Sequence, residues 1–201
     1  MSVALHGFSQ SLLTDIFCAD CLSPDRSVWF CYRLSCTDFK FRRWSKMKEL
    51  VAEGNVGELQ KYFGSRMEFG TAGLRAAMGA GISHMNDLTI IQTTQGFCRY
   101  LEKNFSDLKK RGVVIGFDAR AHLSSGGSSK RFARLAANTF ISQGVPVYLF
   151  SDITPTPFVP YTVTHLKLCA GIMVTASHNP KQDNGYKVFL NDLFFFIFVV
   201  F

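Results

Sequence analysis

Charged residues are scarce in this chain of 201 residues, making up 18% of the sequence against 47% for hydrophobic residues. A disordered chain shows the opposite balance, so we expect a packed core. Long hydrophobic runs are also missing. The apolar run at residues 193–201 has nine residues, whereas a bilayer-spanning helix needs roughly 20. The N-terminus lacks the early lysine or arginine of a secretory signal. We therefore expect a cytoplasmic protein without a membrane span.

A basic stripe interleaved with aromatic residues, the usual footprint of nucleic-acid binding, is not found either. The formal net charge is +7, but the basic residues are scattered, with short clusters at residues 42–43 and 109–111. Nucleic acid is therefore not an expected partner. Small phosphorylated molecules fit the positive charge better, because that charge accompanies a specific motif near the end of the chain.

Four of the six cysteines fall within the first 36 residues. Cys18 and Cys21 form a C-x-x-C pair, and Cys31 and Cys36 follow with a wider spacing and no turn glycines. A zinc site normally shows two close pairs or a matching histidine pair. We favour free thiols in a cytosolic protein. A zinc-binding N-terminal module stays an alternative that the metal content of the purified chain would test.

Hydrophobic periodicity predicts an alternation of helices and strands over most of the chain. We expect helices near residues 44–54, 57–63, 86–104 and 128–143 and one ending at residue 165, with strands at residues 113–117, 145–150 and 169–175. This order indicates an α/β fold with a mixed, mostly parallel sheet and helices on both faces. We assign residues 46–192 to this domain, and treat residues 1–45 and the apolar tail at 193–201 as atypical ends.

Two polar segments follow predicted strands directly. Asp118 and Arg120 come after the first strand, and the segment at residues 175–187, TASHNPKQDNGYK, comes after the third. Ligands of such sheets bind beyond the carboxyl ends of the strands. We therefore expect both segments to contribute to one site.

The segment at residues 175–187 carries groups that suit phosphoryl transfer. It offers a serine hydroxyl at Ser177, an imidazole at His178 and an ammonium at Lys187. Phosphoryl transfer depends on alignment and charge neutralisation, which these groups could supply. A serine hydrolase fits less well, because the G-x-S-x-G elbow is absent and adjacent side chains diverge in an extended chain.

Three motifs together resemble those of the α-D-phosphohexomutase superfamily. The pattern T-x-S-H-N-P followed by N-G-x-K, which marks the phosphoserine loop of that family, is unbroken at residues 175–187. Upstream, residues 69–75 (FGTAGLR) resemble the first substrate-side loop, and residues 118–120 (DAR) resemble a D-x-R element. The surrounding sequence is most similar to phosphopentomutase-type phosphoglucomutases and their glucose-1,6-bisphosphate synthase relatives. The resemblance implies the fold of the first of four family domains.

The resemblance also implies catalytic roles. Ser177 would be phosphorylated, would exchange its phosphate with the sugar, and would bind an essential Mg²⁺ through that phosphate. His178 would orient substrate or phosphate beside the phosphoserine. Lys187 would assist proton transfer at the sugar hydroxyl or stabilise charge there.

Further residues would bind substrate or shape the pocket by the same resemblance. Arg75 would contact the phosphoserine or the substrate, and Arg120 would hold the loop or contribute positive potential. Thr71, Gly73 and Asn179 would shape the pocket. Outside these motifs, residues 124–129 could be a phosphate cradle, but a loop with a helix N-cap is the simpler interpretation.

The implied activity is interconversion of sugar 1-phosphates with 6-phosphates or 5-phosphates through a sugar bisphosphate. The implied substrates are glucose 1-phosphate, ribose 1-phosphate or deoxyribose 1-phosphate, with glucose 1,6-bisphosphate as activating phosphoryl donor and a monomeric state. The D-G-D-x-D loop that supplies the Mg²⁺ carboxylates of the family does not occur in this sequence. An alternative is therefore a truncated, inactive isoform that binds phosphosugars weakly or acts as an interaction fragment.

Overall fold

A computed structural model describes residues 47–70, 73–122 and 125–190 of the chain. Residues 47–52 are helical. The elements that follow are α4 Val56–Phe63, β1 Phe69–Gly70, β2 Gly73–Ala77, α5 Asp87–Asn104, α6 Leu108–Arg111, β3 Val113–Phe117, β4 Ala121–His122, β5 Gly127–Ser128, α7 Ser129–Ser142, β6 Val147–Leu149, α8 Phe158–His165, β7 Ala170–Val174 and β8 Asp183–Leu190. The alternation of helices and strands predicted from periodicity is confirmed.

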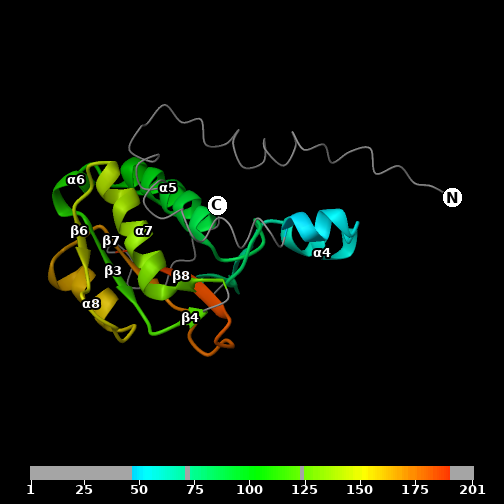
Figure 1. Cartoon of the computed structure of the whole chain (residues 1–201). Coiled ribbons are helices and arrows are strands. Elements are labelled where there is room, and N and C mark those ends of the chain that lie inside the picture. Colours follow the sequence, from blue (N-terminus) through cyan, green and yellow to red (C-terminus); the bar gives the residue numbers. More distant parts are fainter. Residues whose placement is uncertain (1–46, 71–72, 123–124, 191–201) are drawn as a thin grey trace.

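The main sheet has six strands in the order β1-β2-β8-β7-β3-β6 (Figure 1). Strand β3 pairs in parallel with β6 and with β7, whereas β8 runs antiparallel between β7 and β2. Strand β1 is antiparallel to β2. Four strands (β2, β3, β6 and β7) therefore share one direction, and β8 and β1 run the other way. The predicted mixed sheet is confirmed: most of its strands run in one direction, although three of the five neighbouring pairs are antiparallel.

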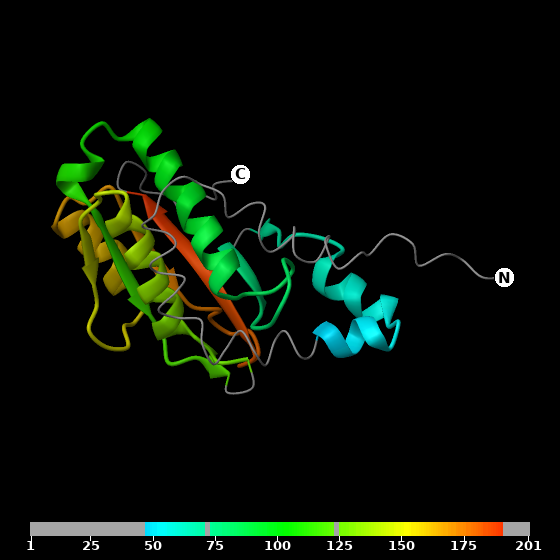
Figure 2. The same cartoon turned by 45° about the horizontal axis from the view of Figure 1, so that its top comes forward.

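Helices cover both faces of this sheet, as Figure 2 shows. Strand β3 is buried along its whole length, and its side chains alternate between the two faces. Val113 and Ile115 join the larger core, which includes side chains of α5 and α7, and Val114 joins a smaller core with α8. A strand buried on both faces is a continuous apolar run in the sequence, which is why periodicity placed it correctly.

Two glycines let α8 approach the sheet closely. A Cβ atom on Gly171 of β7 would lie 2.7 Å from methyl groups of both Val159 and Val163. A Cβ atom on Gly116 of β3 would meet Val159 at the same distance. Both valines are buried in the smaller core, so this layer has no room for an added methyl group without a shift of α8.

The variant Gly171→Ala is therefore expected to destabilise the fold by about 1–3 kcal/mol, the usual cost of overpacking a core. Urea unfolding followed by circular dichroism measures this change. Gly96→Ala is the matched control, because Gly96 lies in α5 with nothing within 4 Å of its added Cβ. It should stabilise the fold by about 0.5–1 kcal/mol. Equal stability of the two variants would contradict the tight packing of α8.

Two segments expected to be loops are strands in the structure. Residues 69–75 lie largely in β1 and β2, and the second half of the 175–187 segment opens β8, an eight-residue strand. Both segments were expected to be loops because they resemble loops of the family, and their glycine and asparagine residues are typical of turns. Pairing with neighbours overrides that local signal. The buried Tyr186 side chain anchors β8, with its hydroxyl 3.1 Å from the hydroxyl of Thr94 in α5.

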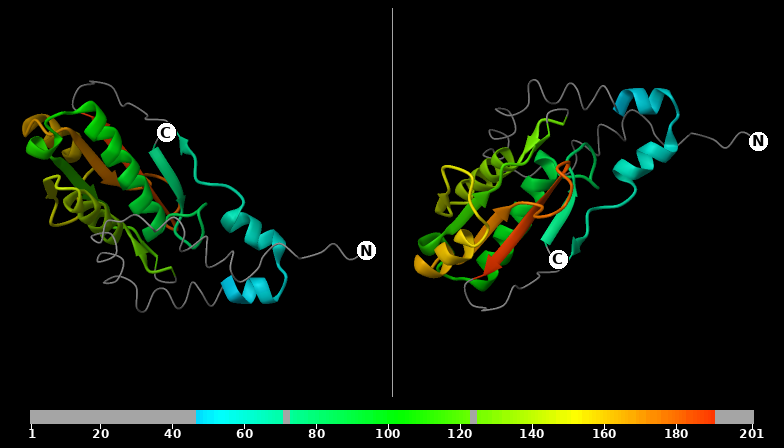
Figure 3. Two further views of the ribbon diagram at one scale, coloured as in Figure 1. Left: turned by 90° about the horizontal axis from the view of Figure 1, so that it is seen from above. Right: turned by 90° about the horizontal axis from the view of Figure 1, so that it is seen from below.

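The helical segment at residues 47–63 stands apart from the α/β body in both views of Figure 3. Its contact with the body includes Tyr62, whose ring stacks on His84 at 4.9 Å between centroids. Ser83 donates a hydrogen bond to the carbonyl oxygen of Lys61. Within the described ranges, no helix is long and apolar enough to cross a membrane. The four N-terminal cysteines and the apolar tail lie outside the described residues.

Candidate active site

The connection between β7 and β8, residues 175–182, is called the Ser177 turn below, and it presents Ser177 to solvent. Ser177 has a φ of 57°, in the left-handed region that residues other than glycine rarely occupy. The backbone N–H of Asn179 donates to the carbonyl of Ala176 (3.1 Å), and that of Asp183 donates to the carbonyl of Pro180 (3.0 Å). The turn is thus a defined structure rather than a loose loop, and its strained residue is the one expected to carry phosphate.

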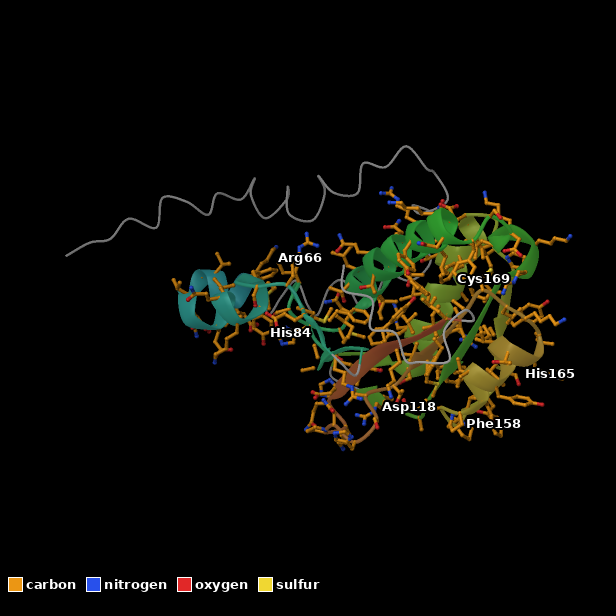
Figure 4. All side chains as sticks on the ribbon, turned by 180° about the vertical axis from the view of Figure 1, so that it is seen from behind. Arg66, His84, Asp118, Phe158, His165 and Cys169 are labelled. Carbon is orange, nitrogen blue, oxygen red and sulfur yellow. The ribbon has the colours of Figure 1, made fainter. Side chains whose placement is uncertain are left out.

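Asp118 lies beneath this turn, at the end of β3, where Figure 4 labels it. One carboxylate oxygen accepts the backbone N–H of Arg120 (3.0 Å) and the hydroxyl of Ser129 (2.5 Å). The other accepts the hydroxyl of Thr175 (2.6 Å) and Nε of Arg120 (3.2 Å). Thr175 in turn accepts the backbone N–H of Ser177 at 2.9 Å. The carboxylate therefore links the first segment of the site to the second.

Arg120 reaches under the turn and donates to its backbone carbonyls. Its NH1 nitrogen donates to the carbonyls of Pro180 (2.6 Å) and Asp183 (3.1 Å). Its NH2 nitrogen donates to those of Ser177 (2.7 Å) and Asn179 (2.8 Å). The Arg120 side chain is 12% exposed. The two polar segments, both predicted to lie beyond the carboxyl ends of the strands, are thus in direct contact.

A buried polar pair that sequence reasoning missed supports the same turn from the interior. Asn184 is fully buried, and its side-chain amide donates to the Ser129 hydroxyl at 3.0 Å. Its side-chain oxygen accepts the backbone N–H of Gly185 at 2.8 Å. A buried amide needs such partners. An asparagine–glycine pair is common in turns, and no local feature of the sequence indicated the contact with Ser129, 55 residues away.

The described part of the 124–129 segment, residues 125–129, contains β5 and the start of α7, in agreement with the simpler interpretation of a helix N-cap. Ser128 is the N-cap of α7, and its hydroxyl accepts the backbone N–H of Arg131 at 3.2 Å. An N-cap serine satisfies one of the free amides at a helix start.

Arg75 and Lys187 place two partly buried positive charges on the adjacent strands β2 and β8. Arg75 pairs with Gly185 in the register of β2 and β8, and Lys187 follows two residues later on the same face. NH1 of Arg75 donates to the side-chain oxygen of Asn179 at 2.9 Å. Its buried Nε has no hydrogen-bond partner among the described residues. Burial of the ammonium, and secondarily the charge of Arg75, lower the pKa of Lys187 from its usual value.

The backbone of Gly73 in β2 lies very close to the backbone of β8. Its φ is 94°, and an added Cβ would lie 2.7 Å from the carbonyl oxygen of Tyr186 and 3.3 Å from Cγ of Lys187. A side chain at residue 73 would therefore clash with the β8 backbone at Tyr186 and crowd Lys187. His178 is exposed next to Ser177, and Thr71 lies outside the described residues. The structure thus gathers Ser177, His178 and Asn179 in one turn and sets Arg75 and Lys187 beside it.

The residues present fit a Mg²⁺ site poorly. The part of the chain that the structure describes holds no group of three histidine, cysteine, aspartate or glutamate side chains that could bind a metal ion. Both carboxylate oxygens of Asp118 already accept hydrogen bonds. A phosphate on Ser177 would offer one ligand, whereas Mg²⁺ sites normally add protein carboxylates.

Comparison with known proteins identifies relatives of the chain in sequence and in structure. The profile of the family described as phosphoglucomutase/phosphomannomutase, alpha/beta/alpha domain I, matches residues 66–194. Phosphopentomutase from Homo sapiens is 76% identical over 164 residues, which cover 78% of this chain and 27% of the relative. Glucose 1,6-bisphosphate synthase from Mus musculus is 53% identical over 154 residues, covering 73% of this chain and 25% of the relative. The chain thus spans about a quarter of the length of these curated relatives.

Solved structures show the same architecture. A crystal structure assigned to a phosphomannomutase from Thermus thermophilus aligns with a TM-score of 0.52 and 30% identity, covering 63% of this chain and 26% of that one. A phosphoglucomutase/phosphomannomutase family protein from Burkholderia thailandensis shares the fold, with a TM-score of 0.50 and 19% identity over 65% of this chain and 27% of that one. This chain therefore belongs to the phosphoglucomutase/phosphomannomutase family and carries its alpha/beta/alpha domain I.

Proposed function

We propose that this chain carries the phosphoserine domain of a phosphosugar mutase, in which Ser177 accepts and returns the transferred phosphoryl group. The observation that supports it is the exposed, left-handed Ser177 turn beside the cations Arg75 and Lys187. Anions are favoured where fixed positive charge is desolvated and lacks a carboxylate partner. The names of the relatives point to pentose 1-phosphates and glucose 1,6-bisphosphate as the substrate class.

In the proposed cycle, the bond between phosphorus and Oγ of Ser177 breaks while a sugar hydroxyl oxygen bonds to that phosphorus. The hydroxyl proton moves to Oγ of Ser177, which becomes a hydroxyl again, and Lys187 stabilises the charge that develops at the reacting oxygens. The resulting sugar bisphosphate then returns its other phosphoryl group to Ser177: the bond between that phosphorus and its sugar oxygen breaks, Oγ bonds to the phosphorus, and the Ser177 hydroxyl proton moves to the sugar oxygen. Asn179, held by Arg75, would keep the turn at a fixed distance from the substrate. The Mg²⁺ ion expected for the family would neutralise phosphate charge, and its carboxylate ligands are not found among the described residues.

One observation favours the alternative of an inactive form. The described residues supply a nucleophile and two cations but no metal-binding carboxylate cluster. We therefore propose that the isolated chain exchanges phosphate with a bisphosphate yet turns over sugar monophosphates poorly. Measurable turnover of ribose 1-phosphate or glucose 1-phosphate by the pure chain would defeat this part of the proposal. The monomeric state and the cytoplasmic location stay predictions.

The decisive experiment is the intact mass of the purified chain after incubation with glucose 1,6-bisphosphate and Mg²⁺. We expect a gain of one phosphoryl group, which peptide fragmentation should place on Ser177. Incubation with glucose 6-phosphate is the matched control. Donation of its single phosphoryl group would leave unphosphorylated glucose, which is not part of the proposed cycle, so we expect no gain of mass. No gain with the bisphosphate, under conditions in which the chain is folded, would contradict the proposed function.

A further inference from the structure

Arg120 uses every donor of its guanidinium group within the turn and its support. The group has five N–H donors. Nε donates to Asp118, and the two terminal nitrogens donate to the carbonyls of residues 177, 179, 180 and 183, at 2.6–3.1 Å. No donor is left to contact a sugar or its phosphate directly. The placement therefore favours one of the two roles expected from sequence, that of holding the loop.

The direction of these carbonyls matters for an anion on Ser177. In a planar trans peptide, the carbonyl of one residue and the N–H of the next point in opposite directions. Since the carbonyl of Ser177 points to Arg120, the N–H of His178 points away from it, toward the outer side of the turn. The guanidinium charge also offsets four convergent carbonyl dipoles that would otherwise repel a nearby phosphate.

Asp118 holds Arg120 in this position and is also connected to the backbone of Ser177 through Thr175. The carboxylate accepts Nε of Arg120, and it also accepts the Thr175 hydroxyl that in turn accepts the N–H of Ser177. The backbone of Ser177 is thus held at both its N–H and its carbonyl. Two restraints on one residue can keep a left-handed conformation that its side chain would otherwise disfavour.

We propose that Asp118 and Arg120 form a positioning pair that holds the Ser177 turn in its left-handed conformation and turns its carbonyl oxygens away from the transferring phosphoryl group. This inference rests on the proposed function of Ser177. It adds that the guanidinium geometry of residue 120, and not its charge alone, is required. Lysine at this position would keep the charge but could not reach four carbonyls and a carboxylate in one plane.

The test compares R120K and R120Q with R131K in the full chain. Arg131 is the matched control, because it makes a two-pronged ion pair with Asp87 at 2.7 and 3.0 Å, between α7 and the start of α5. Amide hydrogen exchange, resolved residue by residue by NMR, reports on the N–H groups of Ser177, Asn179 and Asp183. Intact mass over time gives the rate of phosphoryl uptake from glucose 1,6-bisphosphate with Mg²⁺.

We expect both Arg120 variants to speed exchange at these three amides on the order of tenfold or more, with R131K at the wild-type rate. Phosphoryl uptake should fall on the order of a hundredfold in both Arg120 variants, as for other misplaced reacting groups. Wild-type exchange in R120K would overturn the positioning role. Wild-type uptake in R120K would show that charge alone suffices, which also overturns it.

Two further readouts keep the outcomes distinct. If R120K does not fold, D118N replaces it, because the amide keeps the size of the carboxylate but cannot accept four donors. The same exchange criterion then decides the question. If the wild-type chain takes up no phosphoryl group, the proposed function fails, and the exchange data alone support or overturn the positioning pair.

Discussion

Ser177→Ala is expected to abolish phosphoryl uptake from glucose 1,6-bisphosphate, because the change removes the hydroxyl oxygen that would bond to phosphorus. The loss should be complete within the detection of intact mass spectrometry. Ser142→Ala is the matched control, because Ser142 lies in α7 and its hydroxyl donates to the carbonyl of Thr139, away from the turn. This control should keep wild-type uptake. A phosphoryl group gained by the Ser177→Ala chain would contradict the assignment.

Ser177→Gly separates the chemical role of this residue from its conformational role. Glycine occupies the left-handed region without the steric cost of about 1–2 kcal/mol that an L-residue bears there. Ser177→Gly should therefore also lose uptake but unfold at a higher urea concentration than Ser177→Ala. A difference of about 1 kcal/mol in the free energy of unfolding is expected. If both variants were equally stable, the left-handed conformation would not be a feature of the folded chain in solution.

Lys187→Met is expected to slow phosphoryl exchange on the order of a hundredfold or more, since positioned charge and proton transfer contribute at this level. Methionine keeps much of the length of lysine without its ammonium. The rate is measured by the time course of intact mass with glucose 1,6-bisphosphate and Mg²⁺. Lys181→Met is the control, because Lys181 is an exposed lysine in the same turn. Equal rates for Lys187→Met and wild type would remove Lys187 from the site.

The lowered pKa of Lys187 also predicts a pH dependence of stability. Between that lowered pKa and the usual value of about 10.5, the unfolded chain binds more protons at this group than the folded chain does. The free energy of unfolding contributed by Lys187 therefore rises with pH through this window. Lys187→Met lacks the contribution, so the stability of wild type relative to this variant should increase as pH rises.

Other groups titrate in the same range with the opposite sign. Burial raises the pKa of the Cys98 thiol to about 11 and also raises the pKa of Tyr186. A buried acid with a raised pKa lowers the free energy of unfolding as pH rises, because the acid ionises at a lower pH in the unfolded chain than in the folded chain. The difference between wild type and Lys187→Met cancels these shared contributions. A flat difference across the alkaline range would show that the ammonium of Lys187 is fully solvated.

Sequence periodicity predicted the parallel part of the sheet and its main helices because each signal is local. A buried strand such as β3 is a continuous apolar run, and α7 repeats its buried positions at helical spacing. Strand β8 was missed for a physical reason. Its first residues carry turn-forming asparagine and glycine, and its strand conformation comes from pairing with β7 and β2. Such pairing depends on residues far away in the sequence.

The sequence by itself was enough to identify the family and to predict the chemistry of the turn, because Ser177, His178 and Lys187 lie in one short motif with a recognisable spacing. The tertiary structure alone decided what surrounds that motif. It placed Arg120 under carbonyls 57 to 63 residues away and Arg75 against Asn179, 104 residues away. The presence of an arginine in the sequence does not show whether its guanidinium group binds substrate or backbone. Its role follows from which acceptors the folded chain brings within hydrogen-bond distance.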